Sequence, residues 1–93
     1  MHVVVFCLDH PEMTEVRRIH FVAHKERLEA AALRALIAGP LFDPDGTISG
    51  SFFLYESEDI ETIRHFVLDD PFNTAGIWKS IEIRHFENRA SRH

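Results

Sequence analysis

The sequence contains only one cysteine, Cys7, so no disulfide can form within the chain. It has no apolar run long enough to cross a membrane, and its first residues show neither the basic region nor the apolar core of a signal peptide. These absences predict a protein of the reducing cytoplasm that has no membrane partner.

Positive charge is also scarce, because 10 Lys and Arg residues stand against 15 Asp and Glu residues and give a formal net charge of −5. The basic residues are scattered among acids and form neither a stripe nor a run, which argues against nucleic acid as a partner. Gly39, Gly46 and Gly50 are too far apart to form a phosphate-binding loop. Since no other cofactor motif is present, we expect no cofactor.

What the sequence does contain is typical of one small folded domain. Of its 93 residues, 45% are hydrophobic and 27% are charged, so residues 1–93 are expected to form a single domain with a frayed polar tail from about residue 87. A chain of this length buries a modest fraction of its surface, and its eight phenylalanines and one tryptophan are consistent with a surface that a partner covers. We therefore expect a homodimer.

The hydrophobic pattern predicts four strands, at residues 2–8, from residue 37, at residues 50–56 and at residues 80–86. The second of these is expected to be short, because Gly39 and Pro40 would end it. Helical periodicity covers about 15–36, with Thr14 as a candidate cap, and 58–68, where a cap begins at Ser57. The apolar stripe predicted for the first helix consists of Val16, Ile19, Val22 or Ala23, Leu33 and Leu36.

The order of these elements is βαββαβ, which is the ferredoxin-like α+β arrangement. Both helices are expected to cover one face of an antiparallel sheet. The chain has no further segment to cover the other face, so a second subunit is the natural candidate.

The segment after the second predicted helix places a carboxylate at a defined turn. Pro71 biases Asp70 away from the helical region, so the helix should end at or before Asp70. Asp70 then lies beside Phe72, where a carboxylate can be partly desolvated. On the first predicted helix His20, His24 and Arg27 are spaced by four and three residues, so they share one face.

Four short motifs occur in a fixed order along the chain. They are His24 with Arg27-Leu28, then Ala38-Gly39-Pro40, then Gly50-Ser51, and finally Asp70-Pro71-Phe72 followed by Ala75-Gly76. In these residues the chain resembles the YciI-like (YCII-related) family of small dimeric α/β-barrel proteins over nearly its whole length.

The resemblance implies a dimeric α/β barrel with a His and an Asp in a common cleft, and these fall on His24 and Asp70. One branch of the family is similar to dehydrochlorinases that act in the breakdown of chlorinated hydroxyquinones. The chain departs from the family pattern just before His24, where it has Phe21-Val22-Ala23 in place of an Arg and polar residues. Arg17 or Arg18 would have to supply the missing contact.

A carboxylate that accepts a hydrogen bond from one imidazole nitrogen makes the other nitrogen a competent general base. We therefore predict that His24 and Asp70 catalyse a cofactor-independent lyase, isomerase or dehydrochlorinase reaction on a small cyclic or aromatic oxygenated substrate. The substrate-binding residues predicted around this pair are Arg27, Gly39, Pro40, Ser51 and Phe72. A histidine–aspartate pair can also be structural, so a module that binds a small ligand without turnover and an accessory domain of a pathway enzyme stay open as alternatives.

Other residues with chemical potential are given simpler interpretations. His20 and His24 could together bind a metal, but no His-Glu-x-x-His motif or third ligand accompanies them, so no metal is expected. Ser51 is not on a strand–Ser–helix elbow, so it is expected to orient a ligand or to be structural. Cys7 should be a buried, unreactive hydrophobe, and Asp69 a solvated neighbour of the functional Asp70.

Overall fold

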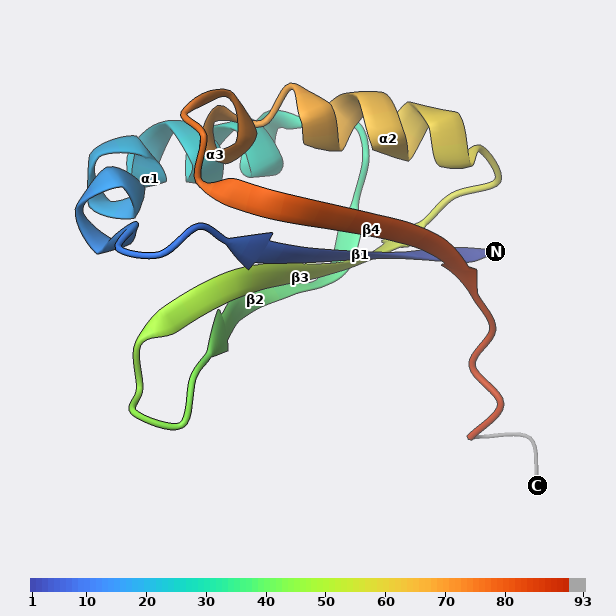
Figure 1. Cartoon of the computed structure of the whole chain (residues 1–93). Helices are drawn as coiled ribbons and strands as arrows, with labels where there is room; N and C mark the ends of the chain where they lie inside the picture. Colours follow the sequence, from blue (N-terminus) through green and yellow to red (C-terminus); the bar gives the residue numbers. More distant parts are fainter. Residues whose placement is uncertain (91–93) are drawn as a thin grey trace.

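The computed structural model describes residues 1–90, which form one sheet with helices on one side of it (Figure 1). The predicted order of strands and helices is confirmed, with one additional short helix before the last strand. The elements are β1 (His2–Asp9), α1 (Thr14–Ala30), β2 (Ala35–Phe42), β3 (Ile48–Glu56), α2 (Ile60–Leu68), α3 (Pro71–Thr74) and β4 (Trp78–Phe86). The predicted frayed tail lies partly outside the described residues.

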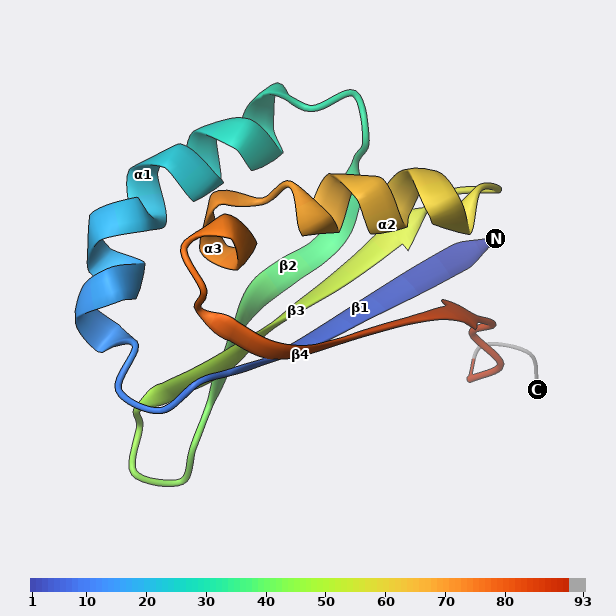
Figure 2. The same cartoon turned by 45° about the horizontal axis from the view of Figure 1, so that its top comes forward.

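The four strands form a single antiparallel sheet in the order β2-β3-β1-β4. Figures 1 and 2 show α1, α2 and α3 on the same face of this sheet. The predicted ferredoxin-like α+β fold class is therefore confirmed. No helix of residues 1–90 is both long and apolar enough to span a membrane.

The core lies between the sheet and the helices, and strand alternation explains which residues enter it. Along β1, Val3, Val5 and Cys7 are fully buried, while the residues between them point to the other face. The remaining members of this cluster come from β3, α2, α3, β4 and the residue just before β4, and they are Phe53, Tyr55, Ile63, Val67, Phe72, Ile77, Trp78 and Ile83.

The first helix differs from the prediction in both length and orientation. It ends at Ala30, and Ala31 has an extended backbone with φ −70° and ψ 145°, because the following residues leave the helix to pair as β2. The predicted apolar stripe is wrong at Ile19 and Val22, which are 61% and 62% exposed, whereas Val16 packs against the core. The buried residues of α1 are Arg17 and His24, so polar partners on the sheet side help to orient the helix.

The second strand is longer than predicted, because it runs through Gly39 and Pro40 instead of ending there. Its only partner among the described strands is β3, so β2 is an edge strand. An edge strand tolerates a proline, since the missing N–H can lie on the unpaired side. The strand ends were also misjudged at β3 and β4, which begin two residues earlier than predicted.

Both predicted helix caps need correction. Thr14 is the first helical residue of α1, and Met13 occupies the cap position without a side-chain hydrogen bond. In α2 the cap is Asp59, whose Oδ1 accepts from the backbone N–H of Glu61 at 3.0 Å. Asp59 satisfies a free N–H of the first turn, as an N-cap aspartate does.

The face of the sheet opposite the helices is largely apolar and has no covering element among residues 1–90. Phe6 and Leu8 on β1 are 40% and 38% exposed, although β1 is a central strand. On the two edge strands, β2 and β4, Ile37 and Phe86 are also exposed.

Candidate functional site

The site is built around α3, a short helix whose ends are fixed by local sequence signals. Asp70 is its N-cap, with an extended backbone, and its Oδ1 accepts from the N–H of Phe72 at 2.8 Å. Pro71 follows at the first helical position, where a proline costs no hydrogen bond. Gly76 ends the helix at φ +76°, with the hydrogen bonds Gly76 N–H to Asn73 O and Ile77 N–H to Phe72 O that define a Schellman motif. The sequence therefore holds the Asp70 carboxylate in one place.

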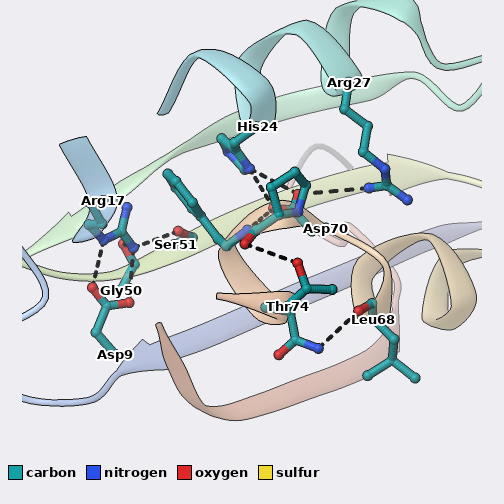
Figure 3. A network of polar contacts seen from close by, with 12 residues as sticks. Asp9, Arg17, His24, Arg27, Gly50, Ser51, Leu68, Asp70 and Thr74 are labelled. Atoms are coloured by element: carbon teal, nitrogen blue, oxygen red, sulfur yellow. Dashed lines mark hydrogen bonds and ion pairs between the residues drawn. The ribbon is translucent and has the colours of Figure 1, made fainter. Parts of the chain in front are cut away.

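His24 and Asp70 are in direct contact, as Figure 3 shows. Nδ1 of His24 lies 2.8 Å from Oδ1 and 2.9 Å from Oδ2 of Asp70. Both side chains are buried, with 9% and 3% of their areas exposed. A carboxylate can only accept here, so in the neutral imidazole Nδ1 carries the proton and donates it to Asp70.

In this tautomer Nε2 of His24 carries no proton. No other described residue forms a hydrogen bond with this atom, and the side chain lines a cavity. An imidazole held in this tautomer presents an acceptor, and thus a proton acceptor, to a bound ligand.

Aromatic rings enclose the imidazole of His24. The ring of Phe72 stacks on it with centroids 3.9 Å apart and planes 6° apart. Trp78 meets it edge-on at 6.5 Å, and Phe53 lies 6.2 Å away. These contacts fix the plane of the imidazole and reduce the access of water to the His24–Asp70 pair.

A cavity of about 790 Å³ lies between α1 and the β2–β3 hairpin. Five of the predicted site residues line it, namely His24, Gly39, Pro40, Ser51 and Phe72. Asp70 stands behind His24 and does not line the cavity.

Arg27 was predicted to bind substrate, but it is not among the lining residues. Its Nη1 lies 3.9 Å from Oδ2 of Asp70 and is buried without a hydrogen bond, and its guanidinium sits 4.0 Å over the ring of Phe66. The structure therefore places Arg27 next to the Asp70 carboxylate and outside the cavity lining.

Arg17, which the sequence offered only as a substitute for a family arginine, lies at the centre of a polar network beside the cavity. Its Nε and Nη2 donate to Asp9 at 2.6 and 2.9 Å, and Nη2 also donates to Gly50 O at 3.0 Å and Ser51 Oγ at 2.9 Å. The signal that would have found it is spacing, because Arg17 precedes His24 by seven residues, or two helical turns, and so shares its face.

Gly50 allows the close packing around this arginine. A Cβ at Gly50 would clash with the backbone oxygen of Cys7, which cannot move aside. The absence of a side chain lets β3 approach β1 while the Gly50 carbonyl receives Arg17. Gly39 is different, since nothing lies within 4 Å of a Cβ placed there.

Cys7 is buried, as predicted, and burial, with the nearby charges of Asp70 and Asp9, raises the pKa of its thiol to about 12. At pH 8 only about 10⁻⁴ of such a thiol is ionised. We expect iodoacetamide to modify Cys7 at least about 10³-fold more slowly in the folded protein than in urea at the same pH. Mass spectrometry of the alkylated protein over time measures both rates, and equal rates would show that the β1 core is open.

No group of three or more His, Cys, Asp or Glu side chains is arranged to hold a metal ion in the part of the chain that the structure describes. His20, the residue considered as a partner of His24, does not line the cavity.

A ferredoxin-like sheet with helices on one face, and a buried histidine–carboxylate pair beside a cavity, define the class of small α/β proteins with the dimeric-barrel fold. Within this class the chain belongs to the YCII-related family, because the model of that domain matches residues 1–87. No curated protein sequence matches the chain.

Two solved structures show how far this likeness extends. The chain is 27% identical, over 94% of both chains and with a TM-score of 0.84, to 5-chloro-2-hydroxyhydroquinone dehydrochlorinase from Burkholderia phenoliruptrix AC1100, determined in complex with 2,5-dihydroxybenzoquinone. It is also similar in fold to Rv0793 from Mycobacterium tuberculosis, at 12% identity, 97% coverage of both chains and a TM-score of 0.58. The second likeness concerns the fold alone.

Proposed function

We propose that the protein is an enzyme in which His24, oriented by Asp70, removes a proton from a small cyclic or aromatic oxygenated substrate. The observation that carries this proposal is the bond from Nδ1 of His24 to both oxygens of Asp70, with Nε2 left free on a residue that lines the cavity. A base positioned in this way contributes about 10²–10⁴-fold to a rate.

Dehydrochlorination is the reaction that we favour within this class. It removes one proton and one chloride ion from the substrate, and His24 would take the proton while chloride leaves from carbon. The support comes from the structural likeness to a dehydrochlorinase and from the cavity walls, where Phe21, Phe53 and Phe72 suit a flat ring. Lyase and isomerase reactions that begin with the same proton removal fit the geometry equally well.

The test is turnover by the purified wild-type protein. We would measure chloride release and the ultraviolet spectrum with 5-chloro-2-hydroxyhydroquinone, followed by other chlorinated and non-halogenated hydroxyquinones. Release of chloride faster than in protein-free buffer supports the proposal. Tight binding across the panel without any chemical change would instead favour a ligand-binding module, the second candidate. The third alternative, an accessory domain, predicts no occupied cleft, so a crystal structure with a closed, ligand-free interior would favour it.

We further propose that the protein acts as a cytoplasmic homodimer whose sheets pack face to face. The support is the apolar outer face of the sheet, where Phe6, Leu8, Ile37 and Phe86 are exposed. No element of residues 1–90 covers this face, and a second copy of the chain would bury it. A buried interface of about 2,000 Å² or more, mostly apolar, is expected of an obligate dimer. The single buried thiol of Cys7 is compatible with the reducing compartment.

We expect light scattering to give twice the chain mass at micromolar concentration, and Phe6→Glu to convert the protein to monomer or to unfold it. A charge at Phe6 would be buried unpaired in the interface. The matched control is Ile19→Glu, which places the same charge on the exposed side of α1 and should leave the dimer intact. A wild-type monomer at this concentration would remove the shared-barrel arrangement.

A further inference from the structure

The cavity differs in charge from the rest of the chain. Its titratable lining residues are Arg17, Arg18, His24 and Lys25, and no Asp or Glu lines it. The whole chain, by contrast, carries 15 acidic and 10 basic residues. A cavity that gathers cations on an acidic protein favours an anionic ligand.

Arg17 supplies the fixed part of this charge. Its Nε and Nη2 are held by Asp9, Gly50 O and Ser51 Oγ, so the guanidinium cannot rotate freely. Its Nη1 has no hydrogen-bond partner among the described residues, and in Figure 3 one terminal nitrogen of Arg17 points away from Asp9 without a contact. Nη1 thus offers two N–H groups on a preorganised cation, the geometry that binds an oxyanion with least loss of entropy.

Arg17 and His24 border the same aromatic surface. The guanidinium carbon of Arg17 lies 4.8 Å from the centre of the Phe72 ring, and the imidazole of His24 stacks on that ring at 3.9 Å. Both residues also line the same cavity, so one ligand bound there can contact both. Arg18 and Lys25 are 70% and 63% exposed at the side chain and are paired with Glu15 and Glu29, so they add only a weak, screened attraction and no fixed contact.

We propose that the ligand enters as a planar ring bearing an ionised oxygen, a phenolate or enolate, and that Arg17 Nη1 binds this oxygen while His24 Nε2 faces a second position on the ring. The inference names the substrate class of the proposed function and rests on the same cavity. Its distinctive claim is a preference for the anion, which holds whether or not turnover follows. Arg17 is thereby the residue that determines specificity.

The test compares two probes of nearly equal shape, 4-nitrophenolate and 4-nitroaniline, by calorimetry at a pH where the phenol is ionised. We expect the wild-type protein to bind the phenolate at least about tenfold more tightly than the neutral amine. The affinity for nitrophenol should also rise with pH as the probe itself ionises. Equal affinities for the two probes, or an affinity that follows the neutral phenol, would overturn the inference without any variant.

Two variants then assign the preference to Arg17. In Asp9→Asn/Arg17→Gln the buried pair is neutralised together, so no lone charge is left buried, and the preference should fall to about threefold or less. Lys25→Gln should retain most of the preference and lose only its salt-dependent part. A folded double variant with an unchanged preference would overturn the assignment.

A third variant, His24→Gln, separates this inference from the proposed function. An anion preference that persists in His24→Gln, while turnover is lost, supports both. A preference in a wild-type protein that turns over no substrate leaves the anion site standing and overturns the enzyme. Turnover by a protein without any anion preference would support the enzyme and overturn the anion site.

Discussion

Replacing His24 by alanine is expected to lower kcat/KM by about 10²–10⁴-fold, because the imidazole that lines the cavity and is held by Asp70 is then missing. The measurement is initial chloride release or substrate loss at equal concentrations of folded protein. The matched control is His20→Ala, one turn earlier on the same helix and outside the cavity lining, which should retain activity. Equal losses in both variants would contradict a specific role for His24.

Asp70→Asn should keep the fold and lose a smaller part of the rate. An asparagine oxygen can still accept from Phe72 N–H, but an amide facing Nδ1 of His24 favours the tautomer with the proton on Nε2, which is no longer a base. Since the two residues act as one unit, the double variant Asp70→Asn/His24→Ala should be no slower than His24→Ala alone. Asp69→Asn, which alters an exposed neighbour, is the control, and additive losses in the double variant would argue against a shared function.

Replacing Arg17 by methionine is expected to destabilise the protein by about 3–5 kcal/mol. The side chains of Arg17 and Asp9 are 10% and 4% exposed, so the variant leaves the Asp9 carboxylate buried without its partner. Gly50 O and Ser51 Oγ lose their donor at the same time. Urea unfolding, compared at one protein concentration and with an unchanged m value, measures the loss.

The controls for this prediction come from the same region. Asp9→Leu/Arg17→Met should be less destabilised than Arg17→Met, because the lone charge is gone, although the two oxygens on β3 stay without a donor. Arg18→Gln removes an exposed pair with Glu15 and should change the stability by less than about 1 kcal/mol. A similarly small effect of Arg17→Met would show that Asp9 is hydrated in solution.

The parts of the fold that the sequence predicted well are those governed by local rules. Pro71 disfavours a helical Asp70, and α2 ends before it; the β-branched apolar run at residues 2–8 forms β1. α1 was misjudged because its buried face is polar. Hydrophobic periodicity selected Ile19 and Val22, whereas the residues turned inward are Arg17 and His24. Their hydrogen-bond partners lie more than 30 residues away in the sequence or at the end of β1.

The same limit applies to the site. The meeting of His24 and Asp70 was expected from a family resemblance, since nothing local in the sequence relates two residues 46 positions apart. Asp9 was not recognised as a site residue, because an aspartate at the end of a strand, two residues before a proline, is typical of a turn. Only the folded chain brings Asp9 to Arg17 and Arg17 to Ser51.

The protonation state of His24 tests the central claim most directly. A long-range ¹H–¹⁵N correlation spectrum, recorded at a pH where the imidazole is neutral and assigned by comparison with His24→Gln, reports which ring nitrogen carries the proton. The arrangement with Asp70 predicts a protonated Nδ1 and a bare Nε2 in the wild-type protein, and a shift toward the Nε2–H tautomer in Asp70→Asn. A wild-type His24 with its proton on Nε2 would contradict the account, because the atom that faces the cavity would then donate a proton and could not remove one.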